Sequence, residues 1–227
     1  MAKIVGRPVG RDSSETRERI LISARQLFAD RGFAQTPMTL IAEDAGVTPA
    51  AVRFHFPGRA AIFEVVYTRT IDSVVELARP RIETAPTFVA KVDALLGSLL
   101  ELQKSHRHVA NFTATASVEI KRHEELAHLA NDRRLMDLYA EIARAAVAEG
   151  AIAATDERVV RGMLSATMFG LSQLVPSVSM PTYESYVRAF IRLYDGTLIV
   201  RPDTKRRRAD FVDIEERNVA AVNDAAD

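Results

Sequence analysis

The sequence contains no cysteine, which excludes disulfide bonds, thiolate catalysis and zinc sites with cysteine ligands. It also contains no run of about 18 apolar residues, so no segment is expected to span a membrane. The opening residues, Met-Ala-Lys-Ile-Val-Gly-Arg-Pro, lack the apolar stretch of a secretory signal. We therefore expect a cytoplasmic protein, and the absence of cysteine is compatible with that location.

Sequence patterns that carry enzyme chemistry are missing as well. No glycine-rich phosphate loop, nucleophile elbow or paired-carboxylate motif occurs. His106 and His108 are two residues apart and His123 and His128 are five apart, whereas a helical metal pair requires the i, i+4 spacing. We expect no catalytic residue, no bound metal and no cofactor.

The formal net charge of the chain is zero, but the charges are unevenly distributed. Residues 1–60 carry nine Lys and Arg against six Asp and Glu, a net charge of +3. The net charge is −2 over residues 61–200 and −1 over residues 201–227. The excess positive charge at the N-terminal end permits a surface that faces nucleic acid, although alone it does not indicate one.

Helical periodicity dominates the sequence, and nine segments are expected to form helices. The first runs from about Glu15 to Arg31, with one apolar stripe and with Gly32 as its C-terminal stop. Two short helices follow, at about 36–45 and 48–56. Each opens on a Thr-Pro pair, in which threonine suits the N-cap and proline suits the first helical position.

Six further helices are expected at about 59–78, 86–102, 106–121, 124–149, 156–175 and 181–195. Pro80 is expected to end the first of these. The fold class is all-α, with a three-helix head and a six-helix body. The expected divisions are a flexible basic arm (1–13), the head (14–58), a ligand-binding and dimerisation body (59–200) and a largely disordered tail (201–227), in which 211–222 is the one helical candidate.

Two short helices joined by a tight turn form a helix-turn-helix, the geometry of proteins that read the major groove of DNA. Ala42 is small enough for the two helices to cross closely, and Gly46 suits a turn residue with positive φ. Several apolar residues are expected to pack against Leu27 and Phe28 of the first helix: Ile41, Ala45, Val47 and Val52. Three hydroxyls lie near helix N-termini, where phosphate oxygens are favoured: Thr36, Thr39 and Thr48.

Residues 14–66 carry a larger set of motifs, which includes Leu27-Phe28, Gly32-Phe33, Ile41-Ala42, Ala45-Gly46-Val47-Thr48, Phe54-His55-Phe56 and Arg59. At this spacing the set closely resembles the N-terminal domain of TetR-family bacterial transcriptional repressors. The resemblance implies a nine-helix protomer that dimerises through its last two long helices and has an effector pocket in its body. It also implies that a bound ligand spreads the two heads, so that they no longer match successive half-sites of the DNA.

The resemblance further implies which residues face DNA: Thr39, Thr48, Pro49, Ala50, Arg53, Phe54, His55 and Arg59. Arg59 matches a lysine that usually holds a phosphate. The sequence departs from the family pattern at Arg53, which replaces a tyrosine, at the apolar Pro49 and Ala50, and at Gly58, which replaces a Ser or Asn cap. Arg53 could bind phosphate or read a guanine, so the operator sequence is not derivable.

Two basic segments lie outside the head. Arg7, in a Gly-Arg-Pro tripeptide, could lie in an A·T-rich minor groove, or the arm could be a solubilising extension. The run 205–208 could be a nucleic-acid arm, although four cations followed by acidic residues are more often a solvated tail.

The segment 106–121 is the expected wall of a ligand pocket, because polar residues flank Phe112 in an otherwise apolar helix and would need partners if buried. The candidate lining residues are Asn111, Phe112, Thr115, Tyr139, Phe169 and Gln173, although aromatic residues at helical spacing are more often plain core. This mixture suggests a mostly apolar effector. A four-helix seam across a two-fold axis is predicted for the last two long helices. The segment 158–175 supplies small residues and large apolar ones, and the segment 181–195 supplies further large apolar residues.

The sequence therefore favours a dimeric, ligand-controlled repressor that binds a palindromic operator in double-stranded DNA, and it does not favour an enzyme. An all-α binding module, in which the helix-turn-helix serves only packing, is the alternative. The basic, outward-facing Arg53, His55 and Arg59 are the residues that argue against this alternative.

Overall fold

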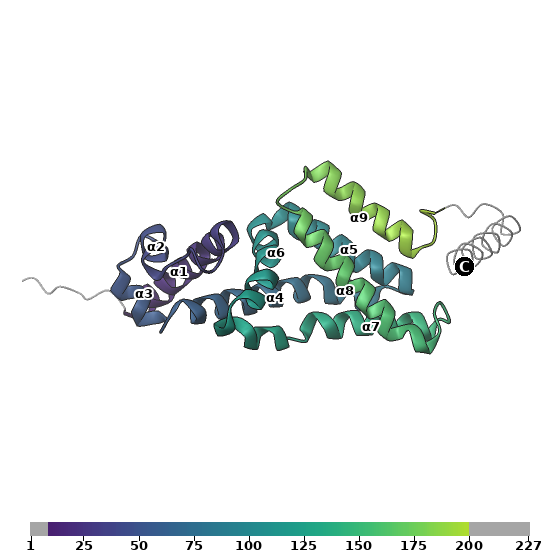
Figure 1. The fold of residues 1–227 in the computed structure, drawn as a ribbon, viewed down its shortest axis with the longest axis horizontal. Helices are drawn as coiled ribbons and strands as arrows, with labels where there is room; N and C mark the ends of the chain where they lie inside the picture. Colours follow the sequence, from purple (N-terminus) through teal and green to yellow (C-terminus); the bar gives the residue numbers. More distant parts are fainter. Residues whose placement is uncertain (1–8, 200–227) are drawn as a thin grey trace, which may run out of the picture. The chain divides into compact units, whose positions relative to one another are not determined.

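The computed structural model describes residues 9–199 of the chain. This range contains nine α-helices, two short 3-10 helices and no β-strand, which confirms the all-α prediction (Figure 1). The elements are α1 (Val9–Arg31), α2 (Met38–Asp44), α3 (Pro49–His55), α4 (Arg59–Thr84), α5 (Phe88–Ser105), α6 (Arg107–Arg122), η1 (Glu124–Asn131), α7 (Arg134–Ala148), η2 (Ala154–Asp156), α8 (Glu157–Leu174) and α9 (Met180–Tyr194). Among these helices none has the length and apolar character of a membrane span.

The described residues up to Ile191 form one compact unit, within which we call α1–α3 the head and the elements from α4 to Ile191 of α9 the body. In the head, α2 and α3 pack on one face of α1 (Figure 1). The buried residues of this core are Ile20, Leu21, Ala24, Leu27 and Phe28 of α1, Ile41 and Ala42 of α2, Ala45 in the turn and Val52 of α3. The burial of these residues confirms the predicted packing. This packing stabilises the head, because full burial of one large apolar side chain contributes about 1.5–3 kcal/mol.

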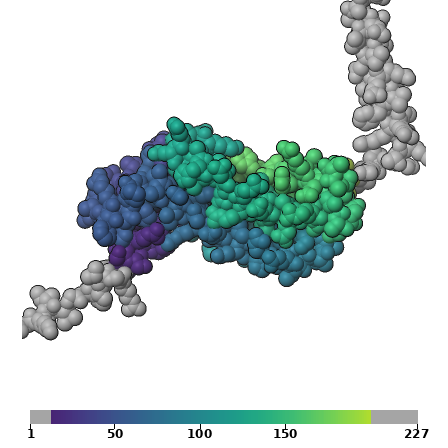
Figure 2. All heavy atoms as spheres, turned by 90° about the horizontal axis from the view of Figure 1, so that it is seen from below, coloured from purple at the N-terminus to yellow at the C-terminus, as the bar shows by residue number. Residues whose placement is uncertain are grey.

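The apolar core of the head continues into the body. Phe28, Phe33 and Phe63 form a cluster with ring centroids 5.1 to 5.9 Å apart, and Phe112 of α6 lies 5.3 Å from Phe63 of α4. Aromatic pairs at such distances add about 0.5–1.5 kcal/mol each. A continuous apolar core therefore joins the head to α4 and α6. In Figure 2 the surface of the head lies at one end of this unit and the surfaces of α7 and α8 lie at the other.

Helix α4 is longer than the sequence predicted. A proline inside a helix removes one backbone hydrogen bond and crowds the preceding turn, so the helix was expected to end before Pro80. It continues instead to Thr84. Ile82 in its last turn is fully buried, and Arg81 forms a 2.5 Å ion pair with Glu101 of α5. These tertiary contacts outweigh the local cost of the proline.

The single helix predicted over 124–149 is divided into η1 and α7. At the break, the carboxylate of Asp132 accepts a hydrogen bond from the backbone N–H of Arg134 at 3.0 Å and also binds its guanidinium. The side-chain hydrogen bond from Arg134 holds the pKa of Asp132 below its usual range. Aspartate competes for backbone groups in this way, an effect that apolar periodicity does not report.

Two other helix starts differ from the prediction. Helix α1 begins at Val9, so residues 9–13 of the predicted flexible arm are helical. Helix α2 begins at Met38, and Thr36 does not cap it. Thr36 is buried, and its hydroxyl donates to the carbonyl oxygens of Gly32 at 2.8 Å and Leu27 at 3.3 Å. A buried hydroxyl needs a partner, and the free carbonyls at the end of α1 supply it, so Thr36 does not offer its hydroxyl to a phosphate.

Candidate nucleic-acid interface

The turn between α2 and α3 is held in place by α1. Gly46 has a φ of +63°, the left-handed conformation that the sequence predicted. Arg19 Nη2 donates to the backbone oxygens of Ala45 at 2.5 Å and Gly46 at 3.1 Å. Ser23 Oγ donates to the carboxylate of Asp44 at 2.6 Å. Polar contacts thus fix the turn in addition to the apolar core.

Replacing Gly46 by alanine is expected to destabilise the protein. A non-glycine residue with positive φ costs about 1–2 kcal/mol, and a Cβ at this position would lie 2.8 Å from Arg19 Nη2. We expect urea denaturation to show a loss of about 1–2 kcal/mol in the free energy of unfolding. The control is Gly97→Ala in α5, where a Cβ meets open space and alanine should stabilise by about 0.5–1 kcal/mol. Two effects of the same sign would contradict this account.

Helix α3 is short and depends on its anchors. Thr48 caps its N-terminus by accepting a hydrogen bond from Ala51 N–H at 3.1 Å, and Pro49 occupies its first turn, as the sequence predicted. Val52 and Phe56 are buried against the rest of the head. Seven residues form a marginal helix on their own, so these anchors set the orientation of α3.

The opposite face of α3 is exposed, and it carries most of the predicted contact residues. The exposed residues are Thr39 of α2, the cap Thr48, and Pro49, Ala50, Arg53 and Phe54 of α3. The Phe54 side chain is 81% exposed, which is unusual for a large apolar ring. Among residues 9–199, no hydrogen bond or ion pair occupies Arg53. The ring of the half-buried His55 lies 5.2 Å from that of Phe54. This face therefore offers a guanidinium, hydroxyls, methyl groups and a ring to a partner.

Arg59 is placed differently from Arg53. Its Nη1 donates to the backbone oxygen of Ala34 at 2.9 Å, and its guanidinium lies 4.0 Å from the centre of the Phe33 ring. It also forms a 3.3 Å ion pair with Glu125 of η1. Arg59 thus fastens the start of α4 to the head and to η1, and the phosphate contact that the resemblance implies for it stays a prediction.

The six predicted pocket residues lie in different surroundings: Asn111, Phe112, Thr115, Tyr139, Phe169 and Gln173. Phe112 belongs to the core shared with the head, and Thr115 Oγ1 donates to Ala29 of α1 at 3.2 Å. Gln173 Nε2 donates to the backbone oxygen of Ala114 at 2.7 Å, which joins α8 to α6. Tyr139 is buried, whereas Phe169 is 45% exposed. Asn111 differs from the others because its Oδ1 is buried without a hydrogen-bond partner.

Glu119 on α6 is a connection that the sequence did not reveal. It is buried, and its carboxylate accepts a hydrogen bond from the backbone N–H of Phe33 at 2.7 Å, just beyond the end of α1. His123 Nε2 lies 3.3 Å from the same carboxylate. Acidic residues on helices are usually solvated, and Phe33 is 86 residues away in the chain, so no local pattern signals this contact.

Some predicted contacts lie outside the described residues. The predicted minor-groove contact of Arg7 lies in residues 1–8, which are not described. The tail 201–227 is not described either, and it holds the basic run 205–208 and the predicted helix 211–222.

Comparisons with known proteins agree with this geometry. Residues 20–66 match the family model described as "Bacterial regulatory proteins, tetR family". The HTH-type transcriptional repressor BepR of Brucella suis biovar 1 is 45% identical over 58 residues, which are 26% of this chain and 28% of that protein. The HTH-type transcriptional activator FasR of Mycolicibacterium smegmatis is 33% identical over 70 residues, 31% of this chain and 32% of that protein. The chain thus matches about a quarter to a third of the length of these relatives.

The likeness in fold extends further than the likeness in sequence. The transcriptional regulator FadR of Bacillus subtilis, solved in complex with stearoyl-CoA, superposes with a TM-score of 0.63 at 17% identity, over 77% of this chain and 97% of that chain. Head and body therefore share the fold of a known regulator, and the head also shares the family's sequence. Residues 20–66 thus carry the N-terminal domain of the TetR family of bacterial regulatory proteins, and the rest of the chain shares the fold of solved regulators.

Proposed function

We propose that the chain is a dimeric transcriptional repressor that binds a palindromic operator in double-stranded DNA and is released by a small molecule. The observation that carries this proposal is the exposed face of α3, with Arg53 and Phe54 on a helix that Val52 and Phe56 anchor. A helix of this kind fits the major groove, where its side chains reach base edges and phosphates.

Selection from a random double-stranded DNA library tests the DNA-binding part of the proposal. The purified chain should recover one sequence with two-fold symmetry, because two identical heads contact two half-sites. Recovery of unrelated fragments in proportion to their abundance would show that α3 does not read DNA. Deleting the gene then tests repression, because transcription beside the recovered site should rise when a repressor is lost. A fall in transcription would indicate an activator, which is how the relative FasR is named.

Dimerisation is supported by an unusual apolar surface on α8 and α9. Four large apolar side chains are 42 to 58% exposed there: Val159, Met163, Phe169 and Tyr186. Gly162, Ala166 and Gly170 are exposed on the same helix, α8, and would let a second helix approach closely. A surface of this kind on a soluble protein marks an interaction site. A second copy of the chain is the partner that matches an operator with two-fold symmetry.

The proposed effector site is in the body. Three polar side-chain atoms are buried there without a hydrogen-bond partner: Gln103 Oε1 of α5, Asn111 Oδ1 of α6 and the Tyr183 hydroxyl of α9. Such atoms cost free energy unless a ligand or water satisfies them. Gln103 also lines a cavity of about 370 Å³ together with Lys104, Arg107, Val178, Ser179 and Met180. The FadR structure named above holds stearoyl-CoA, a ligand with a long apolar acyl chain and a charged coenzyme A part, which supports a small-molecule site in a protein of this fold.

Helix α6 connects the proposed effector site to the head. It carries the unpartnered Asn111, and further along it Thr115 and Glu119 bind Ala29 and Phe33 at the end of α1. A ligand that displaces α6 would therefore displace α1, on which α3 rests. The two heads of a dimer would then change their separation and lose the match to the half-sites.

Replacing Glu119 by alanine is expected to weaken this connection. The Phe33 N–H would remain buried without an acceptor, so the free energy of unfolding measured in urea should fall by about 1–3 kcal/mol. Glu119→Gln keeps an acceptor oxygen and should lose less. Glu124→Ala, at an exposed position of η1, is the control and should change stability by less than about 0.5 kcal/mol. If Glu119→Ala costs no more than this control, Glu119 does not hold the head.

A further inference from the structure

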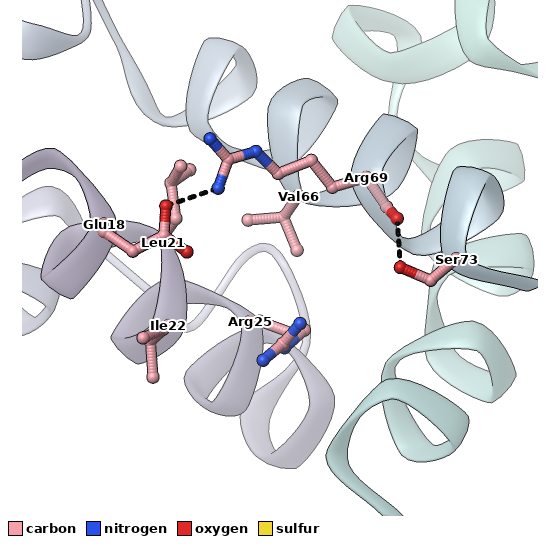
Figure 3. Close-up of a pocket in the computed structure, with 7 residues that line it drawn as sticks. All are labelled: Glu18, Leu21, Ile22, Arg25, Val66, Arg69 and Ser73. Atoms are coloured by element: carbon pink, nitrogen blue, oxygen red, sulfur yellow. Dashed lines mark hydrogen bonds and ion pairs between the residues drawn. The ribbon is translucent and has the colours of Figure 1, made fainter. Parts of the chain in front are cut away.

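A groove of about 210 Å³ lies between α1 and α4, and none of the residues that line it belongs to α3 (Figure 3). Helix α1 lines it with Glu18, Leu21, Ile22 and Arg25, and α4 lines it with Val66, Arg69 and Ser73. These residues recur at intervals of about three to four, so each helix turns one face toward the groove. The groove combines an apolar wall, made by Leu21, Ile22 and Val66, with charged side chains from both helices.

The charges in this groove do not balance. Arg69 Nη1 binds the Glu18 carboxylate at 2.5 Å, which Figure 3 shows as a link from α4 across to α1. No hydrogen bond or ion pair within residues 9–199 occupies Arg25, and its Nε is buried without a partner. The groove therefore has two guanidinium groups for one carboxylate, and one of them has an unsatisfied donor.

Within the described part of the chain, Glu18 is the one carboxylate that acts on the charge of Arg25. Burial lowers the pKa of the Arg25 guanidinium, with a smaller opposing effect from Glu18. Burial, followed by the positive charge of Arg25, lowers the pKa of the nearby His108. Arg25 is half-buried, its buried Nε–H lacks an acceptor at a cost in free energy, and an anion is the group that would satisfy both this donor and the charge.

We propose that this groove binds the oxyanion group of a small molecule, a carboxylate or a phosphate, with Arg25 as its main contact and Arg69 beside it. Guanidinium groups bind both oxyanions through paired N–H donors. The apolar wall would cover a short hydrocarbon part of the molecule. The occupant would bridge the head to α4, and the residues that line this groove differ from those of the effector site proposed in the body. Binding of this small molecule to the groove is measured without DNA, so the proposal is independent of the proposed function.

Thermal unfolding of the full chain with sodium butyrate, sodium phosphate or 1-butanol, at constant ionic strength in chloride, tests the proposal. An anion that binds only the folded protein raises the Tm as its concentration rises. We expect butyrate or phosphate to raise the Tm and butanol not to, and the more effective of the two anions identifies the oxyanion class. Arg25→Met keeps the apolar stem and should weaken the anion's affinity roughly tenfold or more. Arg144→Gln, at an exposed position of α7, should respond like the wild type.

A second readout separates binding from a structural role for Arg25. Because Arg25→Met removes an unsatisfied buried donor, its Tm without anion should equal or exceed that of the wild type. An unchanged response to the anion in Arg25→Met would overturn the proposal. So would a wild-type Tm that depends on neither butyrate nor phosphate, or an Arg25→Met protein that is less stable than the wild type without anion.

Discussion

Arg53→Ala is expected to reduce operator affinity strongly while leaving the stability of the protein unchanged. Arg53 is exposed and bound to no other side chain among residues 9–199, so its removal costs the fold little. A specific arginine contact contributes about 1–3 kcal/mol, and a dimer carries two, so affinity should fall roughly 30-fold or more. If both contacts are to phosphates, the slope of log affinity against log salt should also decrease by about 2.

Arg59→Ala provides the comparison for this result. Arg59 binds Ala34, the Phe33 ring and Glu125, so its loss should lower the free energy of unfolding by about 1–2 kcal/mol. Arg53→Ala is therefore expected to change affinity alone, whereas Arg59→Ala is expected to lower stability in addition to any loss of its predicted phosphate contact. Affinity measured by fluorescence anisotropy and stability measured in urea make the distinction. An Arg53→Ala protein that binds DNA as tightly as the wild type would remove α3 from the interface.

Ala166→Arg is expected to separate the dimer into monomers. Ala166 lies on the exposed apolar surface of α8 near Met163, and a second helix packed there would have to bury the added charge. Arginine is a good helix former, so the protomer should still fold. Light scattering should report the monomer mass. Operator affinity should fall toward the level of non-specific binding, a loss of roughly 1,000-fold.

Ala148→Arg is the matched control for this substitution. It places the same charge at an exposed position in the last turn of α7, where a cation suits the helix dipole. This variant should remain a dimer and keep its affinity. A dimer that survives Ala166→Arg as well would place the interface on another surface.

The features that could be predicted from the sequence depend on neighbouring residues. The stripe that includes Leu27 and Phe28 predicted the packing of the head, because one helix face repeats every three to four residues. Gly46 and the Thr48-Pro49 pair predicted the turn and the start of α3, because local backbone geometry selects these residues. The exposed face of α3 follows directly from these elements.

The features that escaped prediction depend on residues distant in the chain. Helix α4 continues past Pro80 because Arg81 and Ile82, which follow the proline, make tertiary contacts. The Thr36 hydroxyl points inward because backbone carbonyls at the end of α1 are free to accept its hydrogen bond. Glu119 could be recognised only once α6 was placed beside Phe33. Thr115 and Gln173, two of the predicted pocket residues, bind backbone oxygens of neighbouring helices, because polarity within a helix does not say which face meets a cavity and which meets another helix.

Hydroxyl-radical footprinting of the recovered operator tests the central claim most directly. Two α3 helices in successive major grooves should protect two patches about 10 base pairs, or roughly 34–36 Å, apart on one face of the DNA. Arg53→Ala should weaken both patches together. A single protected patch, or uniform protection along the fragment, would contradict an account in which paired α3 helices read the DNA.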